Sequence, residues 1–319
     1  MTETIPEILR SADGFLVVTH VNPDGDAIGS LLGMHLALRE MGKRSWPLCR
    51  GWVPAMYRFL PGADAVMEEP GSLNSPPAWI ISVDAATEQR ISGDLSGIRP
   101  GAKLINIDHH PTNPRFGDLN LVDPTAASTA ELVLMLLKQA GYKISLNVGR
   151  CLYTGLVTDT GGFRFSGVNA RTLRLAAEML DAGFDSYEVT RHLFEEYPLP
   201  RLQLEKLLLD ILEILLDGRL VLSTLYSEDF TRLGVTLSDS ENLVNRLRES
   251  SGVEAGVLFT KMSEELTRVS LRSKDRVDVS RIAASLGGGG HRHAAGIKST
   301  LPLPALKQRI IAEIQKALA

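Results

Sequence analysis

Cysteine is scarce in this sequence, which has only Cys49 and Cys151 among its 319 residues. The two cysteines are far apart and do not form a CxxC motif. Their number and spacing exclude a disulfide framework and a zinc site built on thiolates. They indicate a protein from a reducing compartment.

Long apolar runs and an excess of positive charge are also missing. No apolar run is long enough to span a bilayer, and the opening MTETIPEILRSADG lacks the basic start and apolar core of a signal peptide. The formal net charge is -4, so there is no overall basic field to hold long duplex DNA. Short anionic substrates need only local positive charge. We therefore expect a cytoplasmic protein that binds neither a membrane nor long duplex DNA.

The first part of the chain alternates short apolar, β-branched runs with helical patterns. The apolar runs are 14–20, 78–85 and 103–110, and the helical patterns are 27–42, 128–141, 146–159 and 169–183. Strands that alternate with helices along the chain predict a parallel, doubly wound sheet.

The remainder of the chain has the pattern of a linker and a second domain. Residues 185–217 contain two prolines followed by a leucine-rich amphipathic helix pattern. Strand patterns begin again at about Arg219, and a helical pattern over 303–319 ends the chain. The sequence therefore predicts an α/β protein with a larger N-terminal parallel-sheet domain (1–190), a helical linker (191–217) and a smaller α/β C-terminal domain (218–319).

Three of the predicted strands end in side chains that can bind a metal, namely His20, Asp84 and Asp108. In a parallel sheet, functional groups gather beyond the carboxyl ends of the strands. Asp24 and Asp26 follow His20 closely, and two neighbouring carboxylates are costly unless a cation lies among them. Carboxylates and neutral imidazoles bind divalent ions such as Mn²⁺ well. The sequence therefore indicates a metal site at this edge of the sheet.

Two of these groups also have a purely structural explanation. Asn22–Gly25 has the residue types of a β-turn. Asp84 could be the N-cap of a helix that begins at Ala85. Taken alone, neither motif decides between the structural and the metal-binding interpretation.

The pair His109–His110 follows directly after Asp108, and Asp159 follows an apolar helical pattern. Adjacent residues of a strand point in opposite directions, so one histidine could bind a metal while its neighbour faces a ligand. The alternatives are a surface loop for the histidines and a helix end for Asp159. Arg164, five residues beyond Asp159, could stabilise a phosphate.

The second domain contains the glycine-rich segment SLGGGGHRHAAG, residues 285–296. The N–H groups of consecutive glycines can form an anion-binding nest, and His291 and His293 stand beside it. The alternative is a helix C-cap followed by a flexible loop. Seven basic and two acidic residues lie between Arg268 and Lys298, which concentrates positive charge in an otherwise acidic chain.

The motifs NPDGDAIGS, DHH and TDTGGF, together with Asp84, resemble in order the four motifs of the DHH phosphoesterase superfamily. GGGGHRHAAG resembles the GGGHxxAAG motif of the DHH-associated C-terminal domain. The resemblance implies two divalent ions, usually manganese, with Asp84 shared between two ligand sets: His20, Asp24 and Asp84; and Asp26, Asp84, His109 and Asp159. It further implies that His110 faces the substrate phosphate and that Asp108 supports the histidines.

The resemblance also implies a substrate. In this superfamily the C-terminal loop binds the nucleotide, which implies substrate-binding roles for Arg272, Ser273, Gly288, Gly289, Gly290, His291 and His293. Two bare domains of this length resemble the oligoribonucleases that release 5′-mononucleotides from short RNA and also act on 3′-phosphoadenosine-5′-phosphate or linear dinucleotides. The alternatives are a pyrophosphatase-like hydrolase of small phosphoanhydrides and a nucleotide-binding protein without catalysis. Relatives are often dimers, so a homodimer is compatible with the resemblance.

Overall fold

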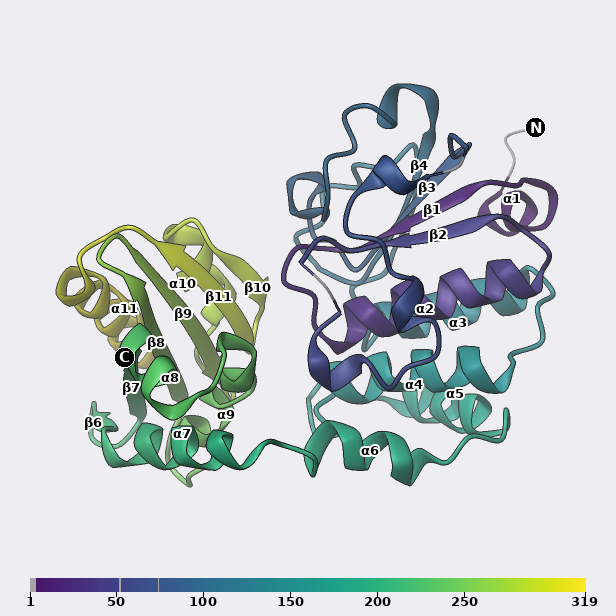
Figure 1. The fold of residues 1–319 in the computed structure, drawn as a ribbon. Helices are drawn as coiled ribbons and strands as arrows, with labels where there is room; N and C mark the ends of the chain where they lie inside the picture. Colours follow the sequence, from purple (N-terminus) through teal and green to yellow (C-terminus); the bar gives the residue numbers. More distant parts are fainter. Residues whose placement is uncertain (1–3, 52, 74) are drawn as a thin grey trace. The chain divides into compact units, whose positions relative to one another are not determined.

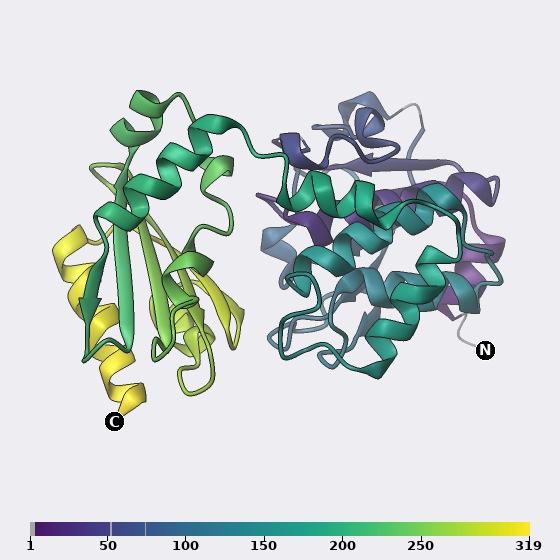
Figure 2. The ribbon, with the colours of Figure 1, turned by 90° about the horizontal axis from the view of Figure 1, so that it is seen from below.

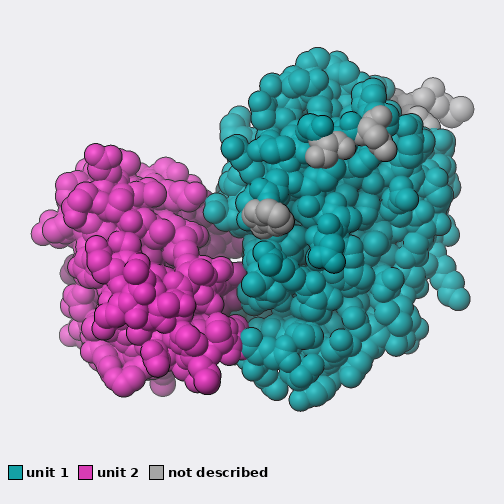
Figure 3. Space-filling model, viewed as in Figure 1, with its two compact units in different colours: residues 1–196 teal, residues 197–319 magenta. Residues whose placement is uncertain are grey.

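A computed structural model describes residues 4–51, 53–73 and 75–319. The chain divides into two compact units, residues 1–196 and 197–319, which Figure 3 shows in different colours. The segment 191–217 spans this division, and its helix α7 (Leu199–Asp210) buries Leu204 and Leu208 in a core of the second unit. The boundaries of the functional domains stay a prediction.

The first unit is built on a parallel sheet, which in the described part of the chain has five strands in the order β2-β1-β3-β4-β5 (Figure 1). The strands are β1 (Phe15–Val18), β2 (Ser45–Leu48), β3 (Trp79–Val83), β4 (Lys103–Asp108) and β5 (Leu119–Val122). The central strands β1, β3 and β4 are the three apolar runs of the sequence, and nearly all of their residues are buried. The predicted α/β class with a parallel sheet is confirmed.

Helices cover one face of this sheet in layers (Figures 1 and 2). They are α1 (Ile5–Ser11), α2 (Gly25–Glu40), α3 (Thr129–Gln139), α4 (Leu146–Asp159), α5 (Ala170–Leu180) and α6 (Ser186–Phe194). Helices α2 and α3 lie against the sheet, and α4 packs on both of them.

Short 3-10 helices complete the first unit. They are η1 (Ala55–Tyr57), η2 (Ala63–Ala65), η3 (Pro70–Ser72), η4 (Glu88–Arg90) and η5 (Arg99–Gly101). Tyr57 and Ala63 join the core on the helical face, whereas Ile91 and Ala102 join a smaller core on the opposite face of the sheet. Both faces of the sheet are therefore covered, as parallel strands require.

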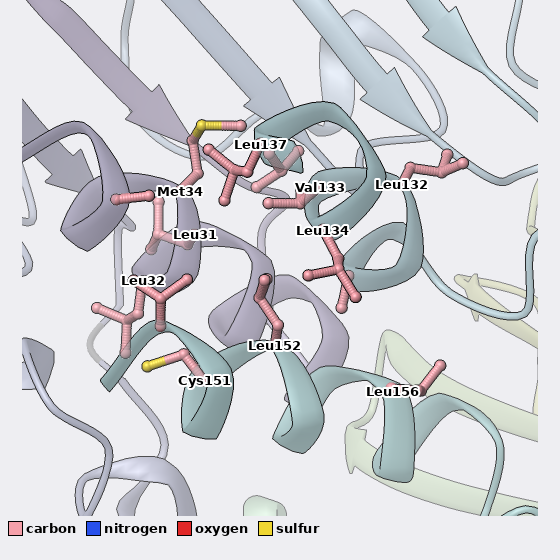
Figure 4. Packing of buried hydrophobic residues seen from close by; sticks show 14 of the residues in the cluster. Leu31, Leu32, Met34, Leu132, Val133, Leu134, Leu137, Cys151, Leu152 and Leu156 are labelled. Carbon is pink, nitrogen blue, oxygen red and sulfur yellow. The ribbon is translucent and has the colours of Figure 1, made fainter. Parts of the chain in front are cut away.

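Helices α2 and α4 approach each other closely because a glycine lies at their contact. A Cβ atom added to Gly29 would lie 2.5 Å from the carbonyl oxygen of Cys151 and 2.7 Å from the amide nitrogen of Gly155. Leucines of α2, α3 and α4 surround this contact and form the main core (Figure 4). Because Gly25 faces Thr158, the first turn of α2 lies beside the last turn of α4.

The second unit contains a mixed sheet, which among the described residues has the strand order β10-β11-β9-β8-β7-β6. The strands are β6 (Glu213–Leu215), β7 (Leu220–Tyr226), β8 (Ala255–Ser263), β9 (Leu266–Ser273), β10 (Gly289–His291) and β11 (Ala294–Ser299). Strands β7 and β8 are parallel, and the other neighbours are antiparallel.

Helices cover both faces of the second sheet. They are α7, α8 (Ser227–Leu233), η6 (Leu237–Ser240), α9 (Val244–Arg248), α10 (Val279–Ser285) and α11 (Leu303–Leu318). Helices α10 and α11 share one core with the sheet, and α7, α8 and α9 share the other. No helix among the described residues has the length and apolar character needed to cross a membrane.

The glycine run differs from the open loop that the sequence suggests. Gly287 follows the end of α10 with a positive φ of 77°, and strand β10 begins at Gly289 and pairs with β11. A Cβ atom on Gly288 would lie 2.2 Å from the carbonyl oxygen of Gly296, and one on Gly290 would lie 2.4 Å from that of Ala294. Gly288 and Gly290 therefore allow close packing within a hairpin, and anion binding by the glycine run stays a prediction.

Candidate metal centre

Eight side chains singled out in the sequence come together at the carboxyl edge of the first sheet. They are His20, Asp24, Asp26, Asp84, Asp108, His109, His110 and Asp159. The ends of β1, β3 and β4 supply five of them, the start of α2 supplies two, and the last residue of α4 supplies one. Within each of three groups, the potential ligand atoms all lie within 4.8 Å of one another: His20, Asp24 and Asp84; Asp26, His109 and Asp159; Asp84, Asp108 and His110.

The structure gives Asp24 and Asp84 different local roles. Asp24 is the N-cap of α2, and its Oδ1 accepts a hydrogen bond from the amide of Ala27 at 3.1 Å. Asp84 is not a helix cap, because the next helical turn, η4, begins after its N-cap Thr87. The Asp84 carboxylate is buried and lies in the cluster.

His20 and His109 are held in the same way. Nδ1 of His20 donates to the carbonyl oxygen of Val21 at 3.0 Å, and Nδ1 of His109 donates to that of Ala126 at 3.3 Å. A backbone carbonyl can only accept, so the proton of each neutral ring lies on Nδ1. In both rings the Nε2 atom then carries the lone pair and faces carboxylates, which is the arrangement of a histidine that binds a metal.

Asp84 lies between these two histidines. Its Oδ2 atom is 3.6 Å from Nε2 of His20, and its Oδ1 atom is 3.7 Å from Nε2 of His109. The backbone of Asp84 is left-handed, with φ 59°, a conformation that Asp tolerates better than most residues. One carboxylate thus presents its two oxygens to two different histidines.

The first turn of α3 holds two of the carboxylates. The amides of Thr129 and Ala130 donate to the two oxygens of Asp26 at 2.6 and 2.9 Å. The hydroxyl of Thr129 donates to Oδ1 of Asp84 at 2.9 Å. The N-terminal end of a helix favours nearby negative charge, so this turn both orients and stabilises the two carboxylates. Sequence reasoning missed Thr129.

Asp108 orients His110. Its Oδ1 atom accepts from Nδ1 of His110 at 2.8 Å, and its Oδ2 atom accepts from the side-chain amide of Asn113 at 2.6 Å. Asn113 is held in turn by the amide of the buried Asn106 at 3.0 Å. Burial raises the pKa of Asp108, but the hydrogen bonds from His110 and Asn113 outweigh burial and hold the pKa below its usual value. Asn113 was also missed, although it follows DHH by only three residues.

Arg164 lies outside the cluster. It is exposed, and its Nε donates to the carbonyl oxygen of Gly161 at 2.6 Å, three residues earlier. This hydrogen bond ties the guanidinium to its own loop. A contact with phosphate at this position stays a prediction.

The second unit brings part of the predicted substrate-binding set together around Ser273. This serine is buried, and its hydroxyl lies 3.2 Å from Nδ1 of His293. Arg248 donates to the carbonyl oxygen of Ser273 at 2.9 Å, and the neighbouring Arg272 is half-buried on β9. His291 follows two of the predicted glycines on β10. Strand β10 pairs with β11, which in turn pairs with the end of β9. Arg248 was not found from the sequence.

The cluster in the first unit fits divalent cations. Burial raises the pKa of Asp84 well above its usual value, and the neighbouring carboxylates raise it further, because they place several negative charges around one buried group: Asp26, Asp24, Asp108 and Asp159. Such a concentration of negative charge is compensated when cations bind. The donors are carboxylate oxygens and imidazole nitrogens, which suit Mn²⁺, Mg²⁺ and similar ions. The described residues can therefore hold metal ions at this edge.

Two protein-family models match this chain. The model described as the DHH family, N-terminal domain, matches residues 14–156, and the model described as the DHHA1 domain matches residues 218–319. The first match covers all strands of the first sheet, and the second covers the second sheet except β6. The chain belongs to the DHH family.

Particular relatives match over nearly the whole chain. The bifunctional oligoribonuclease and PAP phosphatase NrnA of Thermus thermophilus is 35% identical, over 98% of this chain and 93% of that protein. The protein of the same name from Bacillus subtilis is 33% identical, over 91% of each. The crystal structure of an exopolyphosphatase-related protein from Bacteroides fragilis superposes with a TM-score of 0.86 at 28% identity, covering 97% of this chain and 93% of that one.

Proposed function

We propose that this protein is a two-metal phosphoesterase that hydrolyses short oligoribonucleotides to 5′-mononucleotides. Support comes from the buried carboxylate and histidine cluster and from relatives named as oligoribonucleases and PAP phosphatases over nearly their full length. By the same similarity, 3′-phosphoadenosine-5′-phosphate and linear dinucleotides are further substrates.

We assign each ion to one of two ligand sets that share Asp84. The sets are His20, Asp24 and Asp84; and Asp26, Asp84, His109 and Asp159. The observation that carries this assignment is the position of Asp84, whose two oxygens face the Nε2 atoms of His20 and His109 at 3.6 and 3.7 Å. A carboxylate in this position can bridge two cations. Because oxygen and imidazole ligands predominate, Mn²⁺ is the ion that we propose.

The bound ions would supply Lewis-acid chemistry for an in-line displacement at phosphorus, so that no nucleophilic serine or cysteine is needed. The chain itself would orient the phosphate. Nδ1 of His110 donates a hydrogen bond to Asp108, which leaves Nε2 of the same ring to face the phosphate. We assign to His110 the role of donating a proton or a hydrogen bond where negative charge develops.

The second unit would bind the nucleotide. The segment between Arg268 and Lys298 concentrates positive charge, and Arg272 and the β10–β11 hairpin belong to it. We assign nucleotide binding to Arg272, Ser273, Gly288, Gly289, Gly290, His291 and His293. The buried hydroxyl of Ser273 would act mainly by holding His293, since the two groups contact each other.

The test is a hydrolysis assay with Mn²⁺ on RNAs of two to twenty-four nucleotides, 3′-phosphoadenosine-5′-phosphate and pyrophosphate. We expect release of 5′-mononucleotides that is fastest on the shortest RNAs and is lost in EDTA. The variant Asp84→Ala should lose both turnover and bound manganese, because it removes the shared ligand.

Two results would contradict the proposal. Hydrolysis of pyrophosphate alone would indicate a phosphoanhydride hydrolase, and binding of nucleotides without hydrolysis of any substrate would indicate a binding protein. Manganese-dependent turnover retained in Asp84→Ala would contradict the bridging role.

A further inference from the structure

A short turn at the start of α3, residues 126–130, contacts three of the proposed metal ligands. The carbonyl oxygen of Ala126 accepts from His109, and the amides of Thr129 and Ala130 donate to Asp26. The hydroxyl of Thr129 donates to Asp84 at 2.9 Å. The turn supplies no ligand itself, but it sets the direction in which all three ligands point.

The buried carboxylate of Glu131 fixes this turn by accepting a hydrogen bond from its backbone. Its Oε2 atom accepts from the amide of Ala127 at 3.1 Å and from the hydroxyl of Thr172 at 3.2 Å. Ser128 caps the helix by accepting from the amide of Glu131. A capping box would return the Glu131 side chain to the amide of Ser128. Here Glu131 reaches one residue further, so that it fixes the residue next to the carbonyl that binds His109.

Arg171, in the first turn of α5, balances the charge of Glu131. Its Nε donates to Oε1 of Glu131, which is fully buried. Its Nη1 atom lies 3.4 Å from a carboxylate oxygen of Asp123, and its Nη2 atom lies 3.5 Å from the hydroxyl of Thr125. One guanidinium therefore connects α5 both to Glu131 and to the loop that leads from β5 into the turn.

We propose that Glu131 and Arg171 are positioning residues of the metal centre, which act through the turn at 126–130. The inference rests on the proposed function, because it requires Asp26, Asp84 and His109 to bind ions. Groups that orient metal ligands from outside typically contribute 10- to 100-fold to metal affinity. Removing Glu131 would free the turn, and removing Arg171 would leave a buried carboxylate without its cation.

The experiment measures Mn²⁺ affinity by isothermal titration calorimetry without substrate. We expect Glu131→Ala and Arg171→Ala each to weaken binding by about 10-fold or more. Glu131→Gln keeps one acceptor oxygen and should recover part of the affinity. The readout does not depend on activity, and the partly exposed Arg171 gives a second variant if Glu131→Ala does not fold.

Two control variants separate positioning from general stability. Glu178→Ala removes the ion pair with Lys138, which joins the same two helices, α3 and α5, away from the turn. Met179→Ala opens the buried core of α5. When measured well below the melting temperature, both variants should bind Mn²⁺ with the wild-type affinity. Met179→Ala should in addition lower the melting temperature.

Unchanged affinity in Glu131→Ala and Arg171→Ala, while the wild type binds Mn²⁺, would overturn the inference and leave the proposed function intact. An equal loss of affinity in Met179→Ala would also overturn it, because the effect would then be one of stability. A wild type that binds no Mn²⁺ and hydrolyses no substrate would overturn the proposed function and the inference with it.

Discussion

At the scale of single residues, buried histidines in the first unit have different surroundings. His20 and His109 face carboxylates, whereas His35 on α2 is buried with its Nδ1 atom 3.0 Å from the hydroxyl of Ser45. Burial, together with the charge of Arg39, lowers the pKa of His35 from 6.5 to about 4. The folded protein therefore keeps His35 neutral at a pH at which the unfolded chain protonates it.

This difference predicts a loss of stability in acid. The contribution of neutral His35 is fully present above pH 6.5 and is lost as the pH falls from 6.5 towards 4, since only the unfolded chain takes up the proton there. Between pH 7.5 and 5 the wild type should lose about 2 kcal/mol of unfolding free energy from this group. His35→Asn, which can still accept from Ser45, should lose correspondingly less. Denaturant unfolding in EDTA measures both proteins, and equal losses would refute the prediction.

The residues of the cluster could be found from the sequence because each follows an apolar run or belongs to a local motif. Their supports could not be found in this way. Thr129 contacts Asp26 over a sequence separation of 103 residues, and Glu131 contacts Arg171 over 40. Such contacts depend on how helices pack on the sheet, and no local pattern of residues records them.

At the scale of elements, the close contact of α2 with α4 brings Asp26 and Asp159 to the same place. Gly155 contributes as well, since a Cβ atom there would lie 2.8 Å from Oδ1 of Asp26. The sequence predicted both helices but not their contact, because single glycines within a helical pattern indicate only a weaker helix.

The contact can be tested with Gly29→Ala. The added methyl group would meet the backbone oxygen of Cys151 at 2.5 Å, and backbone cannot move aside as a side chain can. We expect an unfolding free energy lower by about 1–3 kcal/mol and weaker Mn²⁺ binding, because the two helix ends separate.

Gly33→Ala is the matched control on the same helix. Its methyl group would meet the flexible end of the Leu152 side chain, which can rotate away. Calorimetry and Mn²⁺ titration should show a clearly smaller effect than for Gly29→Ala. Equal effects in the two variants would refute the role of the Gly29 contact.

The glycine run forms a strand that the sequence did not predict. Glycine has a low strand propensity, so a run of four predicts a loop. The structure nevertheless pairs Gly289 with Gly296 and Gly290 with Ala295. At Gly290 the partner backbone approaches too closely for any larger residue, and this reason for the glycine is visible only once β11 is in place.

At the scale of the whole molecule, the proposed metal ligands and the basic segment lie in different units of the chain. The first unit contains the carboxylate and histidine cluster, and the second contains Arg272 on β9. The order of motifs along the sequence predicted this division of chemistry, and the family models match the same two parts of the chain.

This division predicts that Arg272→Ala affects substrate binding more than turnover. Loss of a charge-assisted bond to phosphate should raise KM about 10-fold or more, with kcat nearly unchanged. Arg281→Ala removes the same charge from an exposed side chain of the same segment and should leave KM unchanged. Steady-state kinetics on a dinucleotide distinguishes them, and a large loss of kcat at constant KM would contradict the binding role of Arg272.

The clustered side chains come from positions between 20 and 159, which span most of the first unit. In an unfolded chain, ligands so widely separated cannot surround one ion together. An ion held there therefore binds the native state in preference to the denatured ensemble and shifts the folding equilibrium by mass action. The supply of that ion would then influence how much of the protein is folded as well as how fast it works.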